Sequence, residues 1–517
     1  MHLLPVFVPF IMTSRVTNPD LQLGVAPLTC KVLRYSKVKP LLPDAGLELW
    51  AAGNERVSHQ LVITAGEEVL EDVSVRLTGD LQGSKGKTLD SGNVALLQVS
   101  YIPDPEGLGI ADKTLQRRFP ELTDPSIRAW PDPLPPLQES FTVPARFNQP
   151  VWIKVSIPEH CPSGLYQGTL LVSAQGIATH HIPLRIHVWP FNLPVTPHLR
   201  TAFGISYPEV LRAHESQGES HKALLQQRYY EILVDHRLSP YYTPTSVASA
   251  ESIRYLRDPR VTSFQANRGD IDFLVAHGLL CKALFYPVDE PRKEEDYERL
   301  IEAGKQIHQK NPIARIVTPL RRRPSFEDPV ELLAGTTWVW CPHISTYDSD
   351  RQLRKRFEER RDLGEEIWVY VSGPGGDYCN FFVHQKGILH RLLFWQLWRY
   401  HLDGLLYWDT TYWKKVSDPW KDMATWFDDR SFGNGSLLYP GKKVGQDEPV
   451  SSQRLECILA GMQDIEYFEL LSQTVGEDMV QQIIAEMVTD FTDYSEDENK
   501  LEELRRQIGE CLTIQTQ

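Results

Sequence analysis

The sequence predicts a multidomain protein with an N-terminal β-sandwich, a central (β/α)8 TIM-like barrel and a C-terminal helical segment. Three observations support this prediction. The N-terminal part alternates apolar with polar residues, the central part alternates short apolar strands with amphipathic helices, and the last part has helical spacing. The expected boundaries are an N-terminal extension at 1–20, the β-sandwich at 21–195, the barrel at 196–448 and the helical region at 449–517.

Composition limits the class of protein. A chain of 517 residues, 41% hydrophobic and 24% charged, is typical of a soluble globular protein with two or three domains. The net charge of -14 argues against a non-specific nucleic-acid binder, which needs clustered Lys and Arg. Seven widely spaced cysteines suggest neither a disulfide framework nor a CxxC metal site.

Targeting signals are weak. The apolar start "MHLLPVFVPFIMTS" lacks a preceding Lys or Arg and contains two prolines, so it is a poor secretory signal. No stretch approaches the roughly 18 consecutive apolar residues that a membrane helix needs, so no membrane span is expected. The sequence leaves the compartment and the oligomeric state open.

Alternation and turn residues predict the β-sandwich. Strands of period two, separated by Gly, Pro, Asn or Asp, are expected at 56–64, 71–79, 151–157, 168–174 and 182–189. An insertion at 102–142 has "WPDPLPPL" near its centre and should run as extended loop. The segment "WPFNLPVTP" (189–197) should be a stiff linker, because proline restricts its own φ and the preceding residue.

The barrel prediction rests on short apolar runs between helical patterns. Eight candidate strands are "TAFGIS" (201–206), "LSPYYT" (238–243), "ALFYPV" (283–288), "ARIVTP" (314–319), "TWVWCP" (337–342), "EIWVYVS" (366–372), "GLLYWDT" (404–410) and "SLLYPG" (436–441). The stretch 244–280 is short for a strand, helix and loop, and holds one further weak candidate, "VTSFQ". The strand count is therefore open by one.

Helical spacing predicts the remaining elements. After the run at 283–288, Tyr297, Leu300 and Ile307 lie near one helix face, with Pro291 expected in the first turn. A helix is also expected after Ser451 and Ser452. The last 37 residues hold nine acidic against three basic residues, which predicts an exposed helix pair and tail.

Two adjacent carboxylates mark the candidate active site. In "ALFYPVDEP" the strand ends at Asp289 and Glu290, and the active site of a (β/α)8 barrel lies at the carboxyl ends of its strands. The competing interpretation is that both residues are favourable charges at the start of a helix, each contributing roughly 0.3 to 1 kcal/mol. The sequence of this motif alone does not separate the two.

Aromatic residues near other strand ends favour a sugar site. Nine of the thirteen tryptophans fall between 338 and 426, and aromatic faces suit the apolar faces of sugar rings. "LLYWDTTYW" repeats the strand-then-polar design, which makes Trp408, Asp409 and Trp413 candidates for sugar binding. "CPHISTYD" adds His343 and Tyr347, although His343 is equally well explained as a structural histidine and any single Trp as core.

Together these motifs resemble a known family. "FYPVDEP", "WVWCPHISTYD", "WVYVSGPGG", "DGLLYWDTTYW" and "GNGSLLYPG", in that order, resemble the catalytic region of glycoside hydrolase family 123, the β-N-acetylgalactosaminidases that share the DUF4091 domain. "ERVSHQLVIT", "WPDPLPPL" and "GLYQGTLLVSAQG" resemble that family's β-sandwich. The resemblance extends from about 25 to 475, and the Asp-Glu pair is its most specific element.

The resemblance implies a retaining, substrate-assisted mechanism. Asp289 would orient the 2-acetamido group of the sugar, and Glu290 would act as general acid and then as base for the water that opens the oxazoline. Tyr370 and Asn434 complete the expected sugar-binding set, and no metal or other cofactor is expected. The implied partner is a glycan or glycoconjugate that carries N-acetylhexosamine.

Two alternatives stay open at this point. A glycosidase with two catalytic carboxylates would use Glu290 and Asp409 on opposite sides of the scissile bond. A carbohydrate-binding protein of the same fold would bind without turnover. The natural glycan, the linkage, exo or endo action, and galactosamine rather than glucosamine are not determined by the residues themselves.

Overall fold

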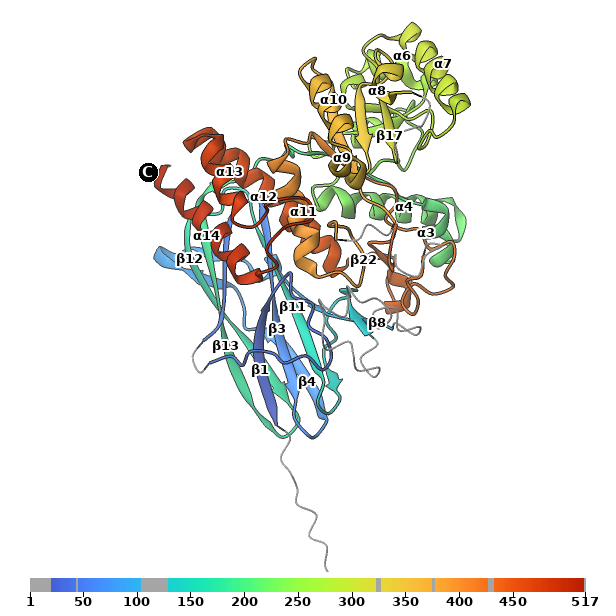
Figure 1. The fold of residues 1–517 in the computed structure, drawn as a ribbon. Coiled ribbons are helices and arrows are strands. Elements are labelled where there is room, and N and C mark those ends of the chain that lie inside the picture. Colours follow the sequence, from blue (N-terminus) through green and yellow to red (C-terminus); the bar gives the residue numbers. More distant parts are fainter. Residues whose placement is uncertain are drawn as a thin grey trace, which may run out of the picture.

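A computed structural model describes residues 20–42, 45–103, 129–321, 327–373, 377–425 and 432–515. The chain forms an N-terminal region of β-sheets, a parallel barrel and a group of C-terminal helices that lies between them (Figure 1). The expected N-terminal extension and most of the insertion at 102–142 lie outside the described residues.

Two sheets make up the N-terminal region. The first has the order β1-β3-β11-β7, and the second the order β10-β4-β12-β13-β2, in which β5 also pairs with β12 and β6 pairs with β5. The strands are β1 (Leu21–Pro27), β2 (Leu47–Gly53), β3 (Glu55–Ala65), β4 (Leu70–Leu77), β5 (Leu81–Gly83), β6 (Thr88–Leu89), β7 (Val94–Gln98), β10 (Phe141–Val143), β11 (Asn148–Ile157), β12 (Gly164–Ala174) and β13 (Ile177–Asn192), while β8 (Tyr101–Pro103) and β9 (Ala129–Pro131) form a separate pair.

Alternation along these strands explains their burial. Ile63 and Ile153 from the first sheet and Val172 and Ile186 from the second are fully buried in one hydrophobic cluster. Their sequence neighbours on each strand point to the opposite face, because side chains alternate along a strand. The region expected to be all-β is therefore rich in sheet, with apolar residues of both sheets sharing one core.

Seven parallel strands form the barrel. Their order is β14-β20-β19-β18-β17-β16-β15, and every neighbouring pair is parallel. The strands are β14 (Arg200–Phe203), β15 (Phe264–Ala266), β16 (Ala283–Phe285), β17 (Arg315–Leu320), β18 (Val339–Pro342), β19 (Glu366–Tyr370) and β20 (Gly404–Tyr407).

The segment Ser239–Tyr241 nearly closes the barrel between β14 and β15. Phe203 N donates to the Ser239 carbonyl at 2.9 Å, and Tyr241 N donates to the Phe203 carbonyl at 2.7 Å. On its other side the Tyr241 carbonyl accepts from Gln265 N at 2.8 Å. The segment thus uses the free edges of both strands, although it forms only a single parallel bridge, Phe203 to Pro240, and no strand.

The structure corrects two of the expected barrel strands. Six of the eight candidates are barrel strands, whereas 238–243 is the bridging segment and "SLLYPG" lies outside the barrel. Tyr439–Pro440 (β21) instead pairs antiparallel with Pro449–Val450 (β22), because Tyr439 packs into a separate core with Trp130 and Val383. The weak candidate "VTSFQ" contains the start of the true strand, β15.

Short and long helices connect and cover the barrel strands. They are α3 (Tyr207–Ala213), α4 (Gly218–Asp235), α5 (Ile253–Leu256), α6 (Ile271–Ala276), α7 (Glu294–Lys310), α8 (Pro329–Leu333), α9 (Ile344–Ser349), α10 (Arg351–Arg361) and α11 (Gly387–Arg399). Tyr297, Leu300 and Ile307 of α7 face the core, as their spacing predicted. The structure places α5 and α6 within the stretch 244–280, so this short stretch supplies β15 and two small helices.

The C-terminal helices join the barrel to the sheets. They are α12 (Gln453–Val475), α13 (Glu477–Ala485) and α14 (Glu498–Gln515). The Ser452 side chain caps α12 by accepting from Leu455 N at 3.1 Å. The expectation of an exposed C-terminal helix pair was wrong, because Leu501 and Ile508 of α14 are fully buried against the rest of the molecule.

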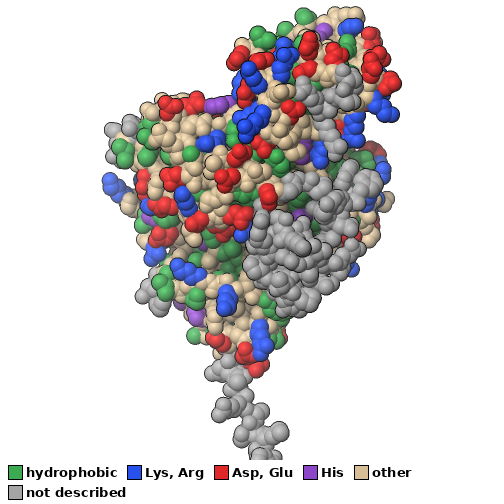
Figure 2. Space-filling model, in the orientation of Figure 1, with side chains coloured by type: hydrophobic (Ala, Val, Ile, Leu, Met, Phe, Trp, Pro, Cys, Tyr) green, Lys and Arg blue, Asp and Glu red, His purple; other side chains and the backbone are tan. Residues whose placement is uncertain are grey.

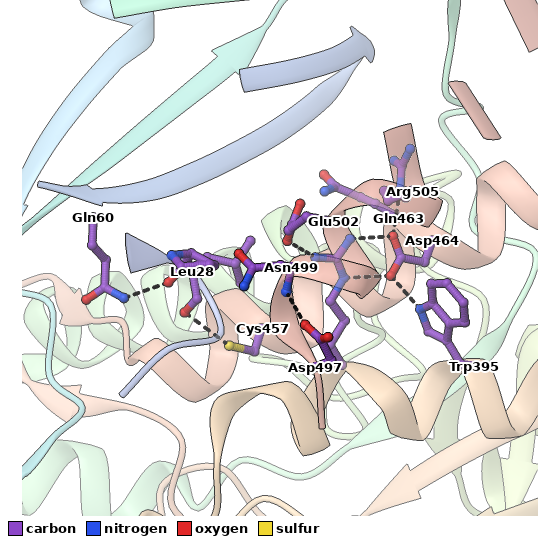
Figure 3. Close-up of polar contacts among 12 residues, drawn as sticks. Leu28, Gln60, Trp395, Cys457, Gln463, Asp464, Asp497, Asn499, Glu502 and Arg505 are labelled. Carbon is purple, nitrogen blue, oxygen red and sulfur yellow. Dashed lines mark hydrogen bonds and ion pairs between the residues drawn. The ribbon is translucent and has the colours of Figure 1, made fainter. Parts of the chain in front are cut away.

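A buried ionic network holds this junction together (Figure 3). Asp464 of α12 accepts from Arg391 Nε of α11 at 2.6 Å, from Trp395 Nε1 at 2.8 Å and from Arg505 Nε of α14 at 2.7 Å. Arg505 also donates to Glu55 of β3 at 2.9 Å. Since each charge has several partners, the network fixes α11, α12, α14 and β3 relative to one another.

The surface carries charges of both signs. On the face drawn in Figure 2, acidic and basic side chains are interspersed over the barrel, the helices and the sheets. In the part of the chain that the structure describes, no helix combines the length and the apolar character required to cross a membrane.

Candidate active site

The carboxyl ends of the barrel strands surround a lumen of apolar and aromatic side chains. Leu284 of β16, Val317 of β17, Trp368 and Tyr370 of β19 and Leu406 of β20 share one buried cluster inside the barrel. Their strand neighbours face the outer helices and belong to a different cluster. The parallel strands therefore present one set of residues to the mouth of the barrel, where the candidate site lies.

Asp289 and Glu290 follow β16 and precede α7 by several residues. The helix begins at Glu294, and its first turn already contains Glu294, Glu295 and Asp296. Asp296 accepts from the backbone N of Lys293 at 3.1 Å, so it caps the helix. The helix terminus is therefore supplied with acidic residues of its own, and the interpretation of Asp289 and Glu290 as its starting charges loses its basis.

The two carboxylates have different partners. Asp289 accepts from the Tyr286 hydroxyl at 2.7 Å. Glu290 accepts from the Tyr370 hydroxyl, which comes from β19, and pairs with the Arg292 guanidinium at 2.6 Å. Glu290 has φ of 38°, a left-handed conformation that non-glycine residues adopt at an energetic cost of about 1 to 3 kcal/mol. This backbone conformation accompanies the divergence of two side chains that are adjacent in sequence.

His343 supports Tyr370 from behind. Its ring lies edge-on to the Tyr370 ring, with centroids 5.1 Å apart, and its Nε2 donates to the Ser372 carbonyl at 2.9 Å while Nδ1 accepts from the Ser345 hydroxyl at 2.7 Å. Burial and the nearby Arg321 guanidinium lower the pKa of His343 to about 4, so the ring is neutral near pH 7. Both nitrogens are occupied within the protein, and the ring is 1% exposed. The ring therefore contacts Tyr370 while both of its nitrogens are bound within the protein.

Asp409 lies after β20, at the junction with β14. Its carboxylate accepts from Ser206 N at 3.2 Å, from the Ser206 hydroxyl and from Thr411 N at 2.8 Å. Burial raises the pKa of Asp409 to about 6, although the hydrogen bonds from Ser206 and Thr411 act to lower it. The side chain is buried and held on both oxygens, so it ties the end of β20 to the loop after β14.

Trp408 is the predicted aromatic residue that keeps part of its ring exposed. Its Nε1 donates to Asn434 Oδ1 at 3.1 Å, and its ring packs 4.8 Å from that of Tyr412. Gly435 has φ of 72°, and a Cβ there would lie 2.1 Å from the Trp408 ring. Asn434 is fully buried, and its Nδ2 finds no acceptor among the described residues. Asn434 thus orients the tryptophan from inside.

Trp413 and Tyr347 are not brought to the mouth of the barrel. Trp413 is fully buried, donates to the Ser436 hydroxyl at 2.9 Å and packs edge-on against Tyr229. Tyr347 is also fully buried, with its ring stacked on Phe357 of α10. Both side chains are core residues in this structure, because loops and helices cover the positions that follow their strands.

Several residues of the site were not predicted from the sequence. Tyr286 binds Asp289, and Arg321 follows β17, where it donates to the Ser372 carbonyl at 3.1 Å. Tyr242 is 42% exposed. Burial raises its pKa, and the negative charges of Asp409 and Asp289 raise the pKa further, so the residue lies near both carboxylates. Tyr286 and Tyr242 lie near the ends of expected strands at 283–288 and 238–243. Their positions in the sequence could therefore have indicated that they belong to the site.

The mouth is therefore rich in carboxylates and tyrosines. Burial raises the pKa values of Tyr286 and Tyr370, and the adjoining carboxylates add to this effect, so both hydroxyls stay protonated and act as donors. Across the described ranges, no group of three or more His, Cys, Asp or Glu side chains is placed to hold a metal ion. The arrangement is able to hold polar groups of a ligand and to exchange a proton through a carboxyl group.

Comparison with known proteins identifies the family. The model of the glycoside hydrolase 123 catalytic domain matches residues 271–471, and the model of the glycoside hydrolase 123 N-terminal domain matches residues 33–174. The chain belongs to glycoside hydrolase family 123. Asp289 and Glu290 thus lie in the catalytic domain of a family 123 glycoside hydrolase, which confirms the resemblance seen in the sequence.

Solved structures were also compared with this chain. A family 123 glycoside hydrolase from Clostridium perfringens, described for glycolipid glycan hydrolysis, is 13% identical with a TM-score of 0.69, covering 96% of this chain and 97% of that one. A β-galacturonidase of family GH2 from Eisenbergiella tayi is 10% identical with a TM-score of 0.30, covering 87% and 73%. No curated protein matches the sequence. The first of these likenesses shows that the family 123 fold extends over nearly the whole chain.

Proposed function

We propose that this family 123 enzyme releases terminal β-linked N-acetylgalactosamine from a glycan or glycoconjugate by a retaining, substrate-assisted mechanism. The 2-acetamido oxygen attacks the anomeric carbon, while Asp289 orients the acetamide N–H and Glu290 protonates the departing oxygen. Glu290 then acts as base for the water that opens the oxazoline. Acid/base work of this kind contributes about 100 to 10,000-fold to the rate.

The divergence of Asp289 and Glu290 is the observation that supports this mechanism best. Two side chains adjacent in sequence are poorly suited to flank a scissile bond from opposite sides, where carboxyl groups are about 5 to 9.5 Å apart. They suit two neighbouring targets on one sugar, the acetamide and the glycosidic oxygen. Their separate partners, Tyr286 for Asp289 and Tyr370 for Glu290, keep the two roles apart.

The acid role requires the ion pair between Glu290 and Arg292 to open. Both Glu290 oxygens are occupied, one by the Tyr370 hydroxyl and the other by the guanidinium, so one of them must be freed for the proton that passes to the leaving oxygen. The Arg292 side chain is 72% exposed and Glu290 22% exposed, so solvent weakens the pair and the arginine is free to move when a leaving group enters.

The remaining parts of the molecule have supporting roles in this proposal. We assign the chemistry to the barrel at 196–448, a β-sandwich at 21–195 to support of the barrel, and the helices at 449–517 to the junction. Trp408 and Tyr370 are proposed to contact the sugar, and His343, Asp409 and Asn434 to hold those contacts in place. The Clostridium perfringens relative is described for glycolipid glycans, which makes such glycans suitable substrates to assay.

Two substitutions and two substrates test the mechanism. Glu290→Gln should lose far more activity on substrates with poor leaving groups than on activated aryl glycosides, whose departing oxygen needs little protonation. Asp289→Asn should lose activity on both. Glu295→Gln, an exposed acidic residue in the first turn of α7, is the matched control and should keep wild-type rates.

The substrate comparison separates the alternatives. Substrate assistance requires hydrolysis of an aryl β-N-acetylgalactosaminide but not of the aryl β-galactoside, and a thiazoline analogue of the oxazoline should inhibit. Equal cleavage of both glycosides would favour two carboxylates, Glu290 and Asp409. Cleavage of neither would leave a carbohydrate-binding protein. Wild-type rates for Asp289→Asn would contradict the proposed mechanism outright.

A further inference from the structure

A cavity of about 350 Å3 opens at the end of β15, next to the candidate site. Its wall includes Tyr242, Thr243, Thr245, Gln265 and Asn267. Its volume falls within the range of about 300 to 1,000 Å3 that ligand sites occupy. Tyr242 links the two places. It borders the cavity, and its ring lies 5.2 Å from that of Tyr241, which in turn lies 6.1 Å from the ring of Tyr286, the partner of Asp289.

Gln265 brings an amide to this cavity. It pairs in register with Leu284 of β16, which points into the barrel, whereas Phe264 and Ala266 on either side belong to the outer core. The Gln265 side chain makes no hydrogen bond with any described residue. The side chain is partly exposed and borders the cavity, so its amide is available to a ligand there.

Thr245 provides a second unused polar group. Its hydroxyl is buried and has no hydrogen-bond partner among the described residues. Its carbonyl accepts from the Thr243 hydroxyl at 2.6 Å, which fixes the turn that carries it. The Gln265 amide and the Thr245 side chain thus border one small hollow, with the Thr245 hydroxyl beneath its surface.

Tyr242 provides an aromatic wall. Its ring is 42% exposed and lies 5.2 Å from the ring of Tyr241, while its carbonyl is held by the Tyr207 hydroxyl at 3.0 Å. The wall contains no Lys or Arg and a single carboxylate, Asp270, which accepts from Asn267 N at 2.8 Å. An aromatic face with neutral donors and acceptors suits a sugar ring better than an anion or an apolar ligand.

We propose that this cavity is a second sugar subsite, which receives a neutral hexose attached to the acetamidosugar that Asp289 orients. The proposal rests on the proposed function. Glu290, the proposed acid, faces Tyr370 and Arg292, so the leaving group departs on that side. Asp289 faces Tyr286, and the rings of Tyr286, Tyr241 and Tyr242 follow one another towards the cavity, so a group bound beyond Asp289 belongs to the retained sugar. The enzyme therefore also cleaves behind an acetamidosugar that is not terminal.

Calorimetry on the Glu290→Gln protein tests this without turnover. The probes are the methyl β-glycoside of N-acetylgalactosamine and three disaccharides that carry a galactosyl residue on its O3, O4 or O6. At least one disaccharide should bind about tenfold tighter than the methyl glycoside. Gln265→Ala, made in this background, should remove that gain and leave the affinity for the methyl glycoside unchanged.

Controls separate the possible failures. Gln309→Ala removes an exposed amide at the end of α7 and should keep the tenfold gain. Thermal melting shows whether each variant is folded, and Gln265→Leu, which retains the bulk of the side chain, replaces Gln265→Ala if that protein unfolds. If all three disaccharides bind no tighter than the methyl glycoside, or if the gain survives the loss of Gln265, the subsite is overturned. If the methyl glycoside and the thiazoline also fail to bind, the proposed function fails with it.

Discussion

The hydroxyl of Tyr370, at the end of β19, donates to the carboxylate of Glu290, in the loop after β16. The two residues are 80 positions apart in the chain, and the strands that carry them are separated by two others in the barrel. The bond therefore spans the mouth of the barrel. It fixes the orientation of one carboxylate independently of the adjacent Asp289.

Removing this hydroxyl should impair catalysis without unfolding the protein. Tyr370→Phe keeps the ring and its contact with His343 but deletes a donor to a charged group, an interaction worth about 1.5 to 3 kcal/mol. We expect kcat/KM for an aryl N-acetylgalactosaminide to fall about tenfold or more at unchanged melting temperature. Tyr378→Phe, which deletes a hydroxyl bound to Asp348, is the control. Unchanged kcat/KM in Tyr370→Phe would show that Glu290 is oriented without it.

His343 should make the fold sensitive to acid. Its pKa is lowered to about 4 in the folded protein from an ordinary 6.5, so its stabilising contribution is complete above pH 6.5 and is lost as the pH falls towards 4. The loss is on the order of 3 kcal/mol. Urea unfolding at pH 7, 5.5 and 4.5 should show a shallower pH dependence in His343→Asn than in the wild type.

A second histidine provides the comparison for that measurement. His160 has an exposed side chain and a left-handed backbone that asparagine tolerates, so His160→Asn should retain the wild-type pH dependence. Equal pH slopes for wild type and His343→Asn would mean that other groups account for any acid sensitivity.

Trp413 should contribute mainly to the stability of the protein, and Trp408 mainly to substrate binding. Trp413 is fully buried, so Trp413→Ala should destabilise the protein by about 3 to 5 kcal/mol and lower its melting temperature. Trp408 is partly exposed, so Trp408→Ala should raise KM with a smaller loss of stability. Unfolding curves and steady-state kinetics on the same preparations check both outcomes. If Trp413→Ala alters KM while stability is unchanged, Trp413 contacts the substrate and is not a core residue.

The network around Asp464 should dominate the stability of the helical junction. Asp464→Asn removes the charge that Arg391 and Arg505 share and leaves both cations partly unpaired in the interior, which typically costs about 3 to 5 kcal/mol. Glu503→Gln breaks a solvent-exposed pair with Arg506 on the same group of helices and should change stability little. Similar denaturation midpoints for the two variants would show that the buried network is dispensable.

The periodicity of apolar residues along the sequence predicted much of the architecture. Alternation marked the N-terminal strands, and short apolar runs marked six of the seven barrel strands, because one face of a strand or helix must be apolar to be buried. The pair Asp289 and Glu290 was noticeable for a similar reason, since carboxylates directly at the end of a buried strand are unusual unless they bind a ligand or take part in catalysis.

Tertiary structure decided the rest. The three-residue strand β15 has too few residues to show a period, and the bridging segment at Tyr241 is defined by hydrogen bonds to two strands distant in sequence. Likewise, "SLLYPG" has the composition of a barrel strand, but other segments occupy the barrel edges. Its Tyr439 packs beside Trp130, and Leu437 and Leu438 pack in the large core.

The same distinction holds within the candidate site. The sequence by itself determined which residues follow the strands, including Glu290, Trp408 and Trp413, and hence which were candidates. Only the tertiary structure decided that Trp413 is covered while Trp408 keeps an exposed part, and that Tyr370 reaches Glu290. The physical reason is that a side chain's exposure and partners depend on loops and strands distant in sequence, whereas periodicity reports only the face of its own element.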